Sequence, residues 1–120
     1  MVDDDLRALV NGVIWPSFEG RELPEWMVEE LQHGLAGVFF FGLNLDLDDP
    51  SQLTALSDQV HSLRPDALTG SDEEGGIVTR IESGQGSQVP GNAVLGRLDD
   101  LELTRAANAH IGSYLSLIHI

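Results

Sequence analysis

The sequence predicts an α/β fold in which parallel strands alternate with helices. Short apolar runs rich in valine, isoleucine and phenylalanine alternate with longer segments whose apolar residues recur at helical spacing. Strands that alternate with helices are joined by crossover connections, which make neighbouring strands parallel. The 120 residues suffice for one domain with a modest core. We therefore expect three strand–helix units, with a ligand site at the carboxyl ends of the strands.

The first strand–helix unit and the second strand occupy residues 8–41. We predict a buried strand over Ala8–Trp15, which Pro16 ends. Another strand is expected at Val38–Phe41, because an uninterrupted apolar run suits a strand covered on both faces. The helix between them begins near Pro24 and ends near Gly34, since proline suits a first helical turn and glycine a C-terminal cap.

The second predicted helix carries the clearest signals in the chain. Asp49 can cap it, Pro50 takes the first helical position, and Gln52 can complete a capping-box-like arrangement. Pro65 ends it, because proline disfavours the helical conformation in the residue before it. Its apolar residues share one face: Leu53, Leu56, Val60 and Leu63.

A third strand is expected at Ala67–Ser71, followed by an acidic stretch and a long loop. Ile77–Ile81 fits a small extra strand, and Glu82–Leu98 is predicted as loop because glycine and polar residues dominate it. The last helix begins at Asp99, which forms a capping-box-like start with Glu102. The longest loop thus follows the third strand, and long loops tend to carry function.

The composition excludes several functional classes. The net charge is −14, from 20 acids against 6 bases, so the chain repels phosphate backbones and we expect no nucleic-acid partner. The sequence lacks both a basic amphipathic helix and a long apolar span, so we expect no membrane partner. The absence of cysteine excludes disulfides. With no secretory signal visible, the expected location is the cytoplasm; the oligomeric state is left open.

Three consecutive acids, Asp72–Glu74, follow the third predicted strand. Charge pattern alone favours a solvated acidic turn. Strand geometry offers another interpretation, since side-chain alternation sends Asp72 and Glu74 to one side and the glutamate between them to the other. The flexible pair Gly75–Gly76 then lets the chain turn back and bring Arg80 to the same mouth. A carboxylate beside a guanidinium can bind sugar hydroxyls or a small anion.

Other chemical motifs are incomplete. Glu30 and His33 form a single Glu-x-x-His pair, where a metal site in a bundle needs paired copies. An alternating acidic run fails as a calcium loop, because Ser51 stands at the glycine position and Ser57 at the closing glutamate position. The chain also lacks Gly-x-Ser-x-Gly. We therefore expect no metal and no cofactor.

The stretch "GSDEEGGIVTRI", preceded by "GVFFFGLN" and followed by "VPGNAVLG", resembles the N-terminal domain of glycoside hydrolase family 3. The likeness is greatest to the bacterial β-N-acetylhexosaminidase branch, and it runs from about Leu6 to about Tyr114. The family pattern is Asp, Gln or Glu, Glu, Gly, Gly, x, Val, x, Arg. The resemblance implies a (β/α)₈ barrel, of the TIM type, that hydrolyses a terminal β-linked N-acetylglucosamine with retention. It implies a carbohydrate substrate.

The resemblance also implies roles for single residues. Asp72 is expected to bind hydroxyls of the terminal sugar, and Arg80 to lie in the same subsite. Glu74, Gly75 and Gly76 are expected to shape the site, while Glu73 occupies the variable Gln/Glu position. A charged carboxylate suits hydroxyl recognition because it makes stronger hydrogen bonds than a neutral acceptor.

The catalytic groups of the family come from later strands and loops than those matched here. Residues 1–114 supply only the first three units of the barrel, so we expect a truncated domain with no catalytic residues of its own. The segment "LSLIHI", Leu115 to Ile120, departs from the family and matches an in-frame translation of a transposon end used in sequencing libraries. Residues 115–120 are therefore expected to be a non-native tail. The alternative is a small, non-catalytic α/β module that binds a sugar or another polar ligand.

Overall fold

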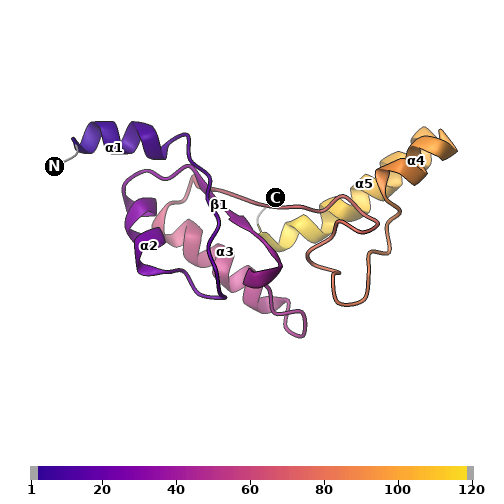
Figure 1. Cartoon of the computed structure of the whole chain (residues 1–120), viewed down its shortest axis with the longest axis horizontal. Helices are drawn as coiled ribbons and strands as arrows, with labels where there is room; N and C mark the ends of the chain where they lie inside the picture. The colour runs from indigo at the N-terminus through magenta and orange to yellow at the C-terminus, as the bar shows by residue number, and fades with distance from the viewer. Residues whose placement is uncertain (1–2, 119–120) are drawn as a thin grey trace.

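Two parallel strands form the centre of the fold, and α2 and α3 pack against one of their faces (Figure 1). The computed structural model describes residues 3–118. Strand β1 (Gly37–Phe40) pairs in parallel with β2 (Leu68–Ser71), and the register places Phe39 opposite Gly70. Helix α3 (Ser51–Leu63) lies between the strands in sequence and makes the crossover. An α/β fold with parallel strands is thus confirmed.

The strand predicted at Ala8–Trp15 is wrong: its first half belongs to helix α1 (Asp4–Asn11), and its second half forms a turn and irregular chain. The acidic start provides the cap: the Asp3 side chain accepts a hydrogen bond from the Asp5 amide at 3.0 Å. The chain then passes β1, and Pro16 O accepts from the Phe39 amide at 2.9 Å. Proline has no amide proton with which to continue a ladder. Among residues 3–118 the sheet therefore has two strands, and three strand–helix units are not seen.

Helix α1 is held to α2 (Glu25–Gln32) by a charged cluster. The Arg7 guanidinium lies 2.7 Å from both Glu29 and Glu30, and Asn11 Nδ2 donates to Glu30 at 2.6 Å. Hydrogen bonds from Arg7 and then Asn11 hold the pKa of Glu30 at about 2. Glu30 therefore serves a contact between helices, and the Glu-x-x-His pair is a structural feature of this surface.

The predicted helix boundaries hold within one or two residues, with two corrections in the caps. Asp49 Oδ1 accepts from the Ser51 amide at 3.1 Å, but Pro50 is the N-cap residue and not the first helical one. Gln52 Oε1 accepts from Asp46 N instead of closing a capping box. The last helix, α5 (Leu101–Leu115), is capped by Asp100, whose Oδ1 accepts from the Leu103 amide. The Glu82–Leu98 loop is also partly wrong, because its end forms α4 (Asn92–Leu98).

The main core lies between the two helices and the inner side chains of the strands. Ile118, in the short 3₁₀ helix η2 (Ser116–Ile118), is fully buried there, and its carbonyl accepts from Thr69 Oγ1. An apolar segment is buried whether or not it is native, so this packing does not test the origin of residues 115–118, and a non-native tail stays a prediction. Residues 119–120 lie outside the described part of the chain. The fully buried apolar side chains are Met27, Leu31, Leu35, Val38, Phe40, Val60 and Ile118.

Helices α4 and α5 reach away from the strands (Figure 1). The described chain measures 56 × 29 × 20 Å with a radius of gyration of 16.5 Å, where a compact domain of this length has about 14 Å. Many apolar side chains are consequently exposed, including Val13, Leu43 and Ile77. Within residues 3–118, no helix combines the length and the apolar character needed to cross a membrane.

Candidate functional site

The candidate site lies at the carboxyl end of β2, on the face of the sheet turned away from α2 and α3. Val38 and Phe40 are buried in the helix-covered core, so alternation turns Phe39 to the other face. Gly70 belongs to that second face, because a Cβ added there would lie 3.3 Å from Phe39 Cε2. Asp72 follows two residues after Gly70, so alternation gives its side chain the same direction.

The structure brings Asp72 and Arg80 together at this edge. Arg80 Nη2 lies 3.2 Å from Asp72 Oδ2, and both side chains are about one third exposed, at 32% and 37%. The guanidinium carbon also lies 5.7 Å from the centre of the Phe41 ring. Arg80 Nε is buried and has no hydrogen-bond partner within residues 3–118. The turn therefore brings Arg80 back to Asp72. Arg80 Nε can still donate a hydrogen bond to a ligand.

Glu73 holds the turn together, a role that sequence reasoning missed. Its Oε1 accepts from the amides of Arg80 and Ile81, and its Oε2 accepts from Thr79 Oγ1, each at 2.7 Å. The carboxylate thereby fixes the backbone that carries the arginine. A glutamine oxygen can accept the same two amide bonds, which gives a physical reason for the Gln/Glu alternation at this position of the family pattern. Glu74, by contrast, is exposed.

The two glycines of the turn lie against the segment at residues 89–91. Gly75 has φ 76°, and a Cβ added to it would lie 2.7 Å from Pro90 O and 2.9 Å from Val89 O. Gly76 has φ 61°, and its amide donates to Val89 O at 2.7 Å. Left-handed φ and this close approach both require glycine. Ile77–Ile81, predicted as a strand, forms turns instead, with one isolated bridge between Gly75 and Val78.

Glu82 connects the long loop to α5. Its carboxylate is buried and accepts from the Gln88 amide at 2.9 Å and from Tyr114 Oη at 2.8 Å. Burial alone would raise the pKa of Glu82, but the hydrogen bonds from Gln88, Tyr114 and Ser87 outweigh it and the pKa is lowered. Burial, and then the bond to Glu82, raise the pKa of Tyr114 to about 12. The phenol oxygen also lies 2.7 Å from His110 Nε2.

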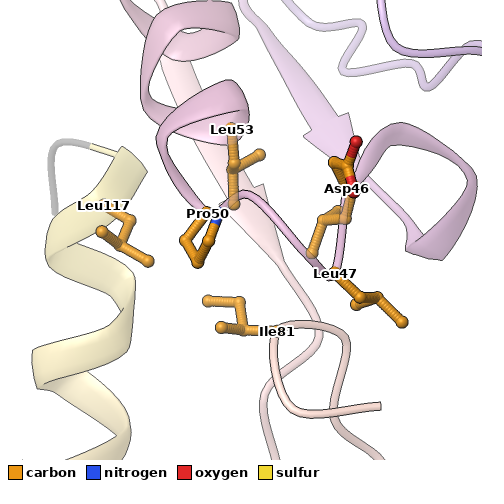
Figure 2. A pocket seen from close by; sticks show the side chains of 7 residues that line it. Asp46, Leu47, Pro50, Leu53, Ile81 and Leu117 are labelled. Atoms are coloured by element: carbon orange, nitrogen blue, oxygen red, sulfur yellow. The ribbon is translucent and has the colours of Figure 1, made fainter. Parts of the chain in front are cut away.

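An apolar seam fixes the other side of the same loop. Ile81 faces Leu117 and the start of α3 across a small pocket of about 20 Å³ (Figure 2). Pro50 and Leu53 come from the α3 end of the seam, and Leu47 from the loop that precedes it. Because Ile81 directly follows Arg80, this packing helps to place the arginine.

The chain is similar to known β-N-acetylglucosaminidases of glycoside hydrolase family 3. Its structure matches that of a family 3 β-N-acetylglucosaminidase from Paenibacillus sp. with a TM-score of 0.82 and 31% identity, over 96% of this chain and 22% of the other. NagZ from Neisseria gonorrhoeae, in complex with N-trifluoroacetyl-D-glucosamine, matches with a TM-score of 0.60 and 25% identity, over 88% of this chain and 31% of the other. The family resemblance is thus confirmed.

A curated relative gives the same result at the level of sequence. The β-hexosaminidase of Methylobacillus flagellatus is 37% identical over 75 residues, which make up 61% of this chain and 21% of the relative. No protein-family model matches the chain. The chain therefore spans about a fifth of the length of this curated relative.

Proposed function

We propose that this chain forms one corner of the sugar-binding site of a retaining glycoside hydrolase acting on terminal β-linked N-acetylglucosamine. The observation that carries the proposal is the Asp72–Arg80 pair at the carboxyl end of β2, in a chain similar to β-N-acetylglucosaminidases over nearly its whole length. Strand ends are where parallel α/β folds bind ligands. Arg80 Nε is buried and has no hydrogen-bond partner within residues 3–118, which supports the proposal because a buried donor favours a ligand acceptor.

The roles differ among the residues of the turn. Asp72 accepts hydrogen bonds from sugar hydroxyls, and Arg80 donates to sugar oxygens while it orients the carboxylate. Gly75 and Gly76 shape the turn, while Glu74 stays at its solvent edge. Retaining hydrolysis needs a nucleophile and an acid/base group on either side of the scissile bond. In our proposal other parts of the enzyme supply both groups, and this chain binds the sugar.

The test is a binding titration of the chain with methyl β-N-acetylglucosaminide, followed by NMR. We expect saturable shifts of the Asp72 and Arg80 signals, loss of binding in Asp72→Ala, and unchanged binding in Ile77→Ala. Ile77 is a suitable control because it belongs to the same turn and its side chain is 99% exposed. A chromogenic β-N-acetylglucosaminide should not be hydrolysed by the chain. Equal affinity in Asp72→Ala and the unaltered chain would contradict the proposal.

A further inference from the structure

The face of the sheet turned away from α2 and α3 carries an ordered row of aromatic side chains that leads to the candidate site. The rings of Trp15 and Phe39 meet edge to face with centres 5.4 Å apart, and those of Phe39 and Phe41 are 5.2 Å apart. Two glycines make room for the indole. A Cβ added at Gly37 would lie 2.6 Å from Trp15 Nε1, and one added at Gly70 would lie 2.8 Å from Trp15 Cζ2. Glycines in both strands therefore make room for this aromatic row.

Phe41 lies at the end of this row, next to the polar pair. The parallel register places Phe39 opposite Gly70 and Phe40 opposite Ser71, so one further step places Phe41 opposite Asp72. Arg80 contacts both, with its guanidinium 5.7 Å from the Phe41 ring centre and 3.2 Å from the Asp72 carboxylate. One aromatic ring, one anion and one cation thus share a single corner.

Part of the Phe41 side chain stays open to a ligand. Phe41 is 39% exposed, which is unusual for a large apolar residue directly after a buried strand. It borders a hollow of about 290 Å³, together with Ser17, Phe18, Glu19 and Leu43.

We propose that Phe41 is a substrate-contact residue, whose ring packs against the apolar face of the pyranose that Asp72 and Arg80 bind. This inference rests on the proposed function. It adds a contact to the apolar face of the sugar, which Asp72 and Arg80 do not provide. A pyranose is amphipathic: its hydroxyls point outward around the ring, and its axial C–H groups form an apolar face. The negative face of an aromatic ring attracts such C–H groups. A polar pair beside an aromatic platform therefore matches both surfaces of one sugar.

The neighbouring aromatic residues keep this platform in place. The Phe39 ring packs against Phe41, and the Trp15 ring packs against Phe39. The Phe41 amide donates to Asn44 Oδ1 at 2.8 Å, and Asn44 is fully buried. Such support limits the conformational entropy lost when a ligand binds.

The experiment is an NMR titration of the full chain with methyl β-N-acetylglucosaminide, observing both protein and sugar. A sugar C–H group over an aromatic ring shifts upfield, a signal that a purely structural role of Phe41 does not produce. We expect Phe41→Leu to weaken binding about three- to tenfold and to abolish the upfield shift. Phe41→Tyr keeps the ring and should retain both affinity and shift. Ile77→Ala, in an exposed part of the turn, should match the unaltered chain.

The outcomes separate this inference from the function on which it rests. If the unaltered chain binds, Asp72→Ala does not, and Phe41→Leu binds with unchanged affinity and shifts, the inference is overturned while the proposed function stands. If the unaltered chain does not bind the sugar, both are overturned. A folded Phe41→Leu variant, checked by the dispersion of its amide signals, excludes simple unfolding as the cause of weaker binding.

Discussion

Replacing Glu73 tests how the turn is held. The Glu73 carboxylate accepts three hydrogen bonds of 2.7 Å, from the Arg80 and Ile81 amides and from Thr79 Oγ1. Glu73→Ala removes all three and leaves the donors without an acceptor. Glu73→Gln keeps an oxygen that can accept both amide bonds, but it removes the charge and replaces the oxygen that accepts from Thr79 Oγ1 by an NH2 group.

The size of the effect follows from the geometry. A hydrogen bond to a charged group contributes about 1.5–3 kcal/mol. The three bonds share one carboxylate, and the turn is partly open to water, so their contributions do not add fully. We therefore expect Glu73→Ala to lower the free energy of local opening by about 2–4 kcal/mol. At 1.4 kcal/mol per tenfold change, amide exchange at Arg80 and Ile81 should accelerate about 30- to 700-fold.

The assay is hydrogen exchange followed by NMR, which reports each amide separately. Glu73→Gln should change exchange at Arg80 and Ile81 by about tenfold or less, because both amide bonds are kept while the charge and the bond from Thr79 are lost. The matched control is Glu74→Ala, because Glu74 is the exposed neighbour. Exchange in Glu73→Ala that equals that in Glu74→Ala at both amides would refute the assigned role of Glu73.

Three further predictions concern the glycine turn, the ion pair of Glu30 with Arg7, and the hydrogen bond between Tyr114 and Glu82. Gly75→Ala should destabilise the chain by about 2–3 kcal/mol in urea denaturation, because φ 76° and the contact with the 89–91 backbone both oppose a Cβ; Gly86→Ala, with φ 84° and open space, should cost only about 1 kcal/mol. The Glu30 pKa of about 2 lies below its ordinary value, so its stabilising contribution is present above about pH 4.5 and is lost as the pH falls towards 2; the difference in urea midpoint between the unaltered chain and Glu30→Gln should shrink over that range. Tyr114 is the single tyrosine, so its absorbance titration is unambiguous and should have a midpoint near 12 in the folded chain, against about 10 in urea. Because folding raises this pKa, the contribution of Tyr114 is present below pH 10 and is lost as the pH rises through 12; Glu82→Gln should lower the folded midpoint, and a folded midpoint near 10 in the unaltered chain would contradict the assignment.

Much of the fold could be predicted because its signals are local. Pro24 and Gly34 bracket α2, and the uninterrupted run at Val38–Phe41 gives β1, since a proline, a glycine and an apolar run act through their own backbone and burial. The prediction for Ala8–Trp15 is wrong because its β-favouring residues indicate a strand, while the acidic residues just upstream cap a helix. The cap of Asp3 and the contact of Arg7 with α2 determine the helix there. That contact is tertiary, and the sequence pattern does not show it.

The pairing of Asp72 with Arg80 could be predicted from the sequence, but the bonds by which Glu73 holds the turn could not. The return of Arg80 to Asp72 could be expected, because two glycines after a strand allow a sharp reversal. Two parts could not be expected. The anchoring of Glu82 by Tyr114 spans 32 residues of sequence, and the slot for Trp15 depends on glycines in both strands. Such pairings become visible only when the elements are placed in space.

The two neighbouring acids Asp72 and Glu73 show what separates a binding carboxylate from a structural one. An ionised carboxylate can accept about four hydrogen bonds. Glu73 uses three of them on its own turn, whereas Asp72 accepts one side-chain bond within residues 3–118, from Arg80. The unused capacity of Asp72 lies at the mouth of the strands, beside an exposed aromatic ring. Sequence alternation predicts that these side chains diverge. In our proposal, the number of hydrogen bonds already made distinguishes Asp72, which binds the ligand, from Glu73, which holds the backbone. The same criterion predicts that sugar should shift the Asp72 carboxyl signal in the NMR titration and leave that of Glu73 nearly unchanged.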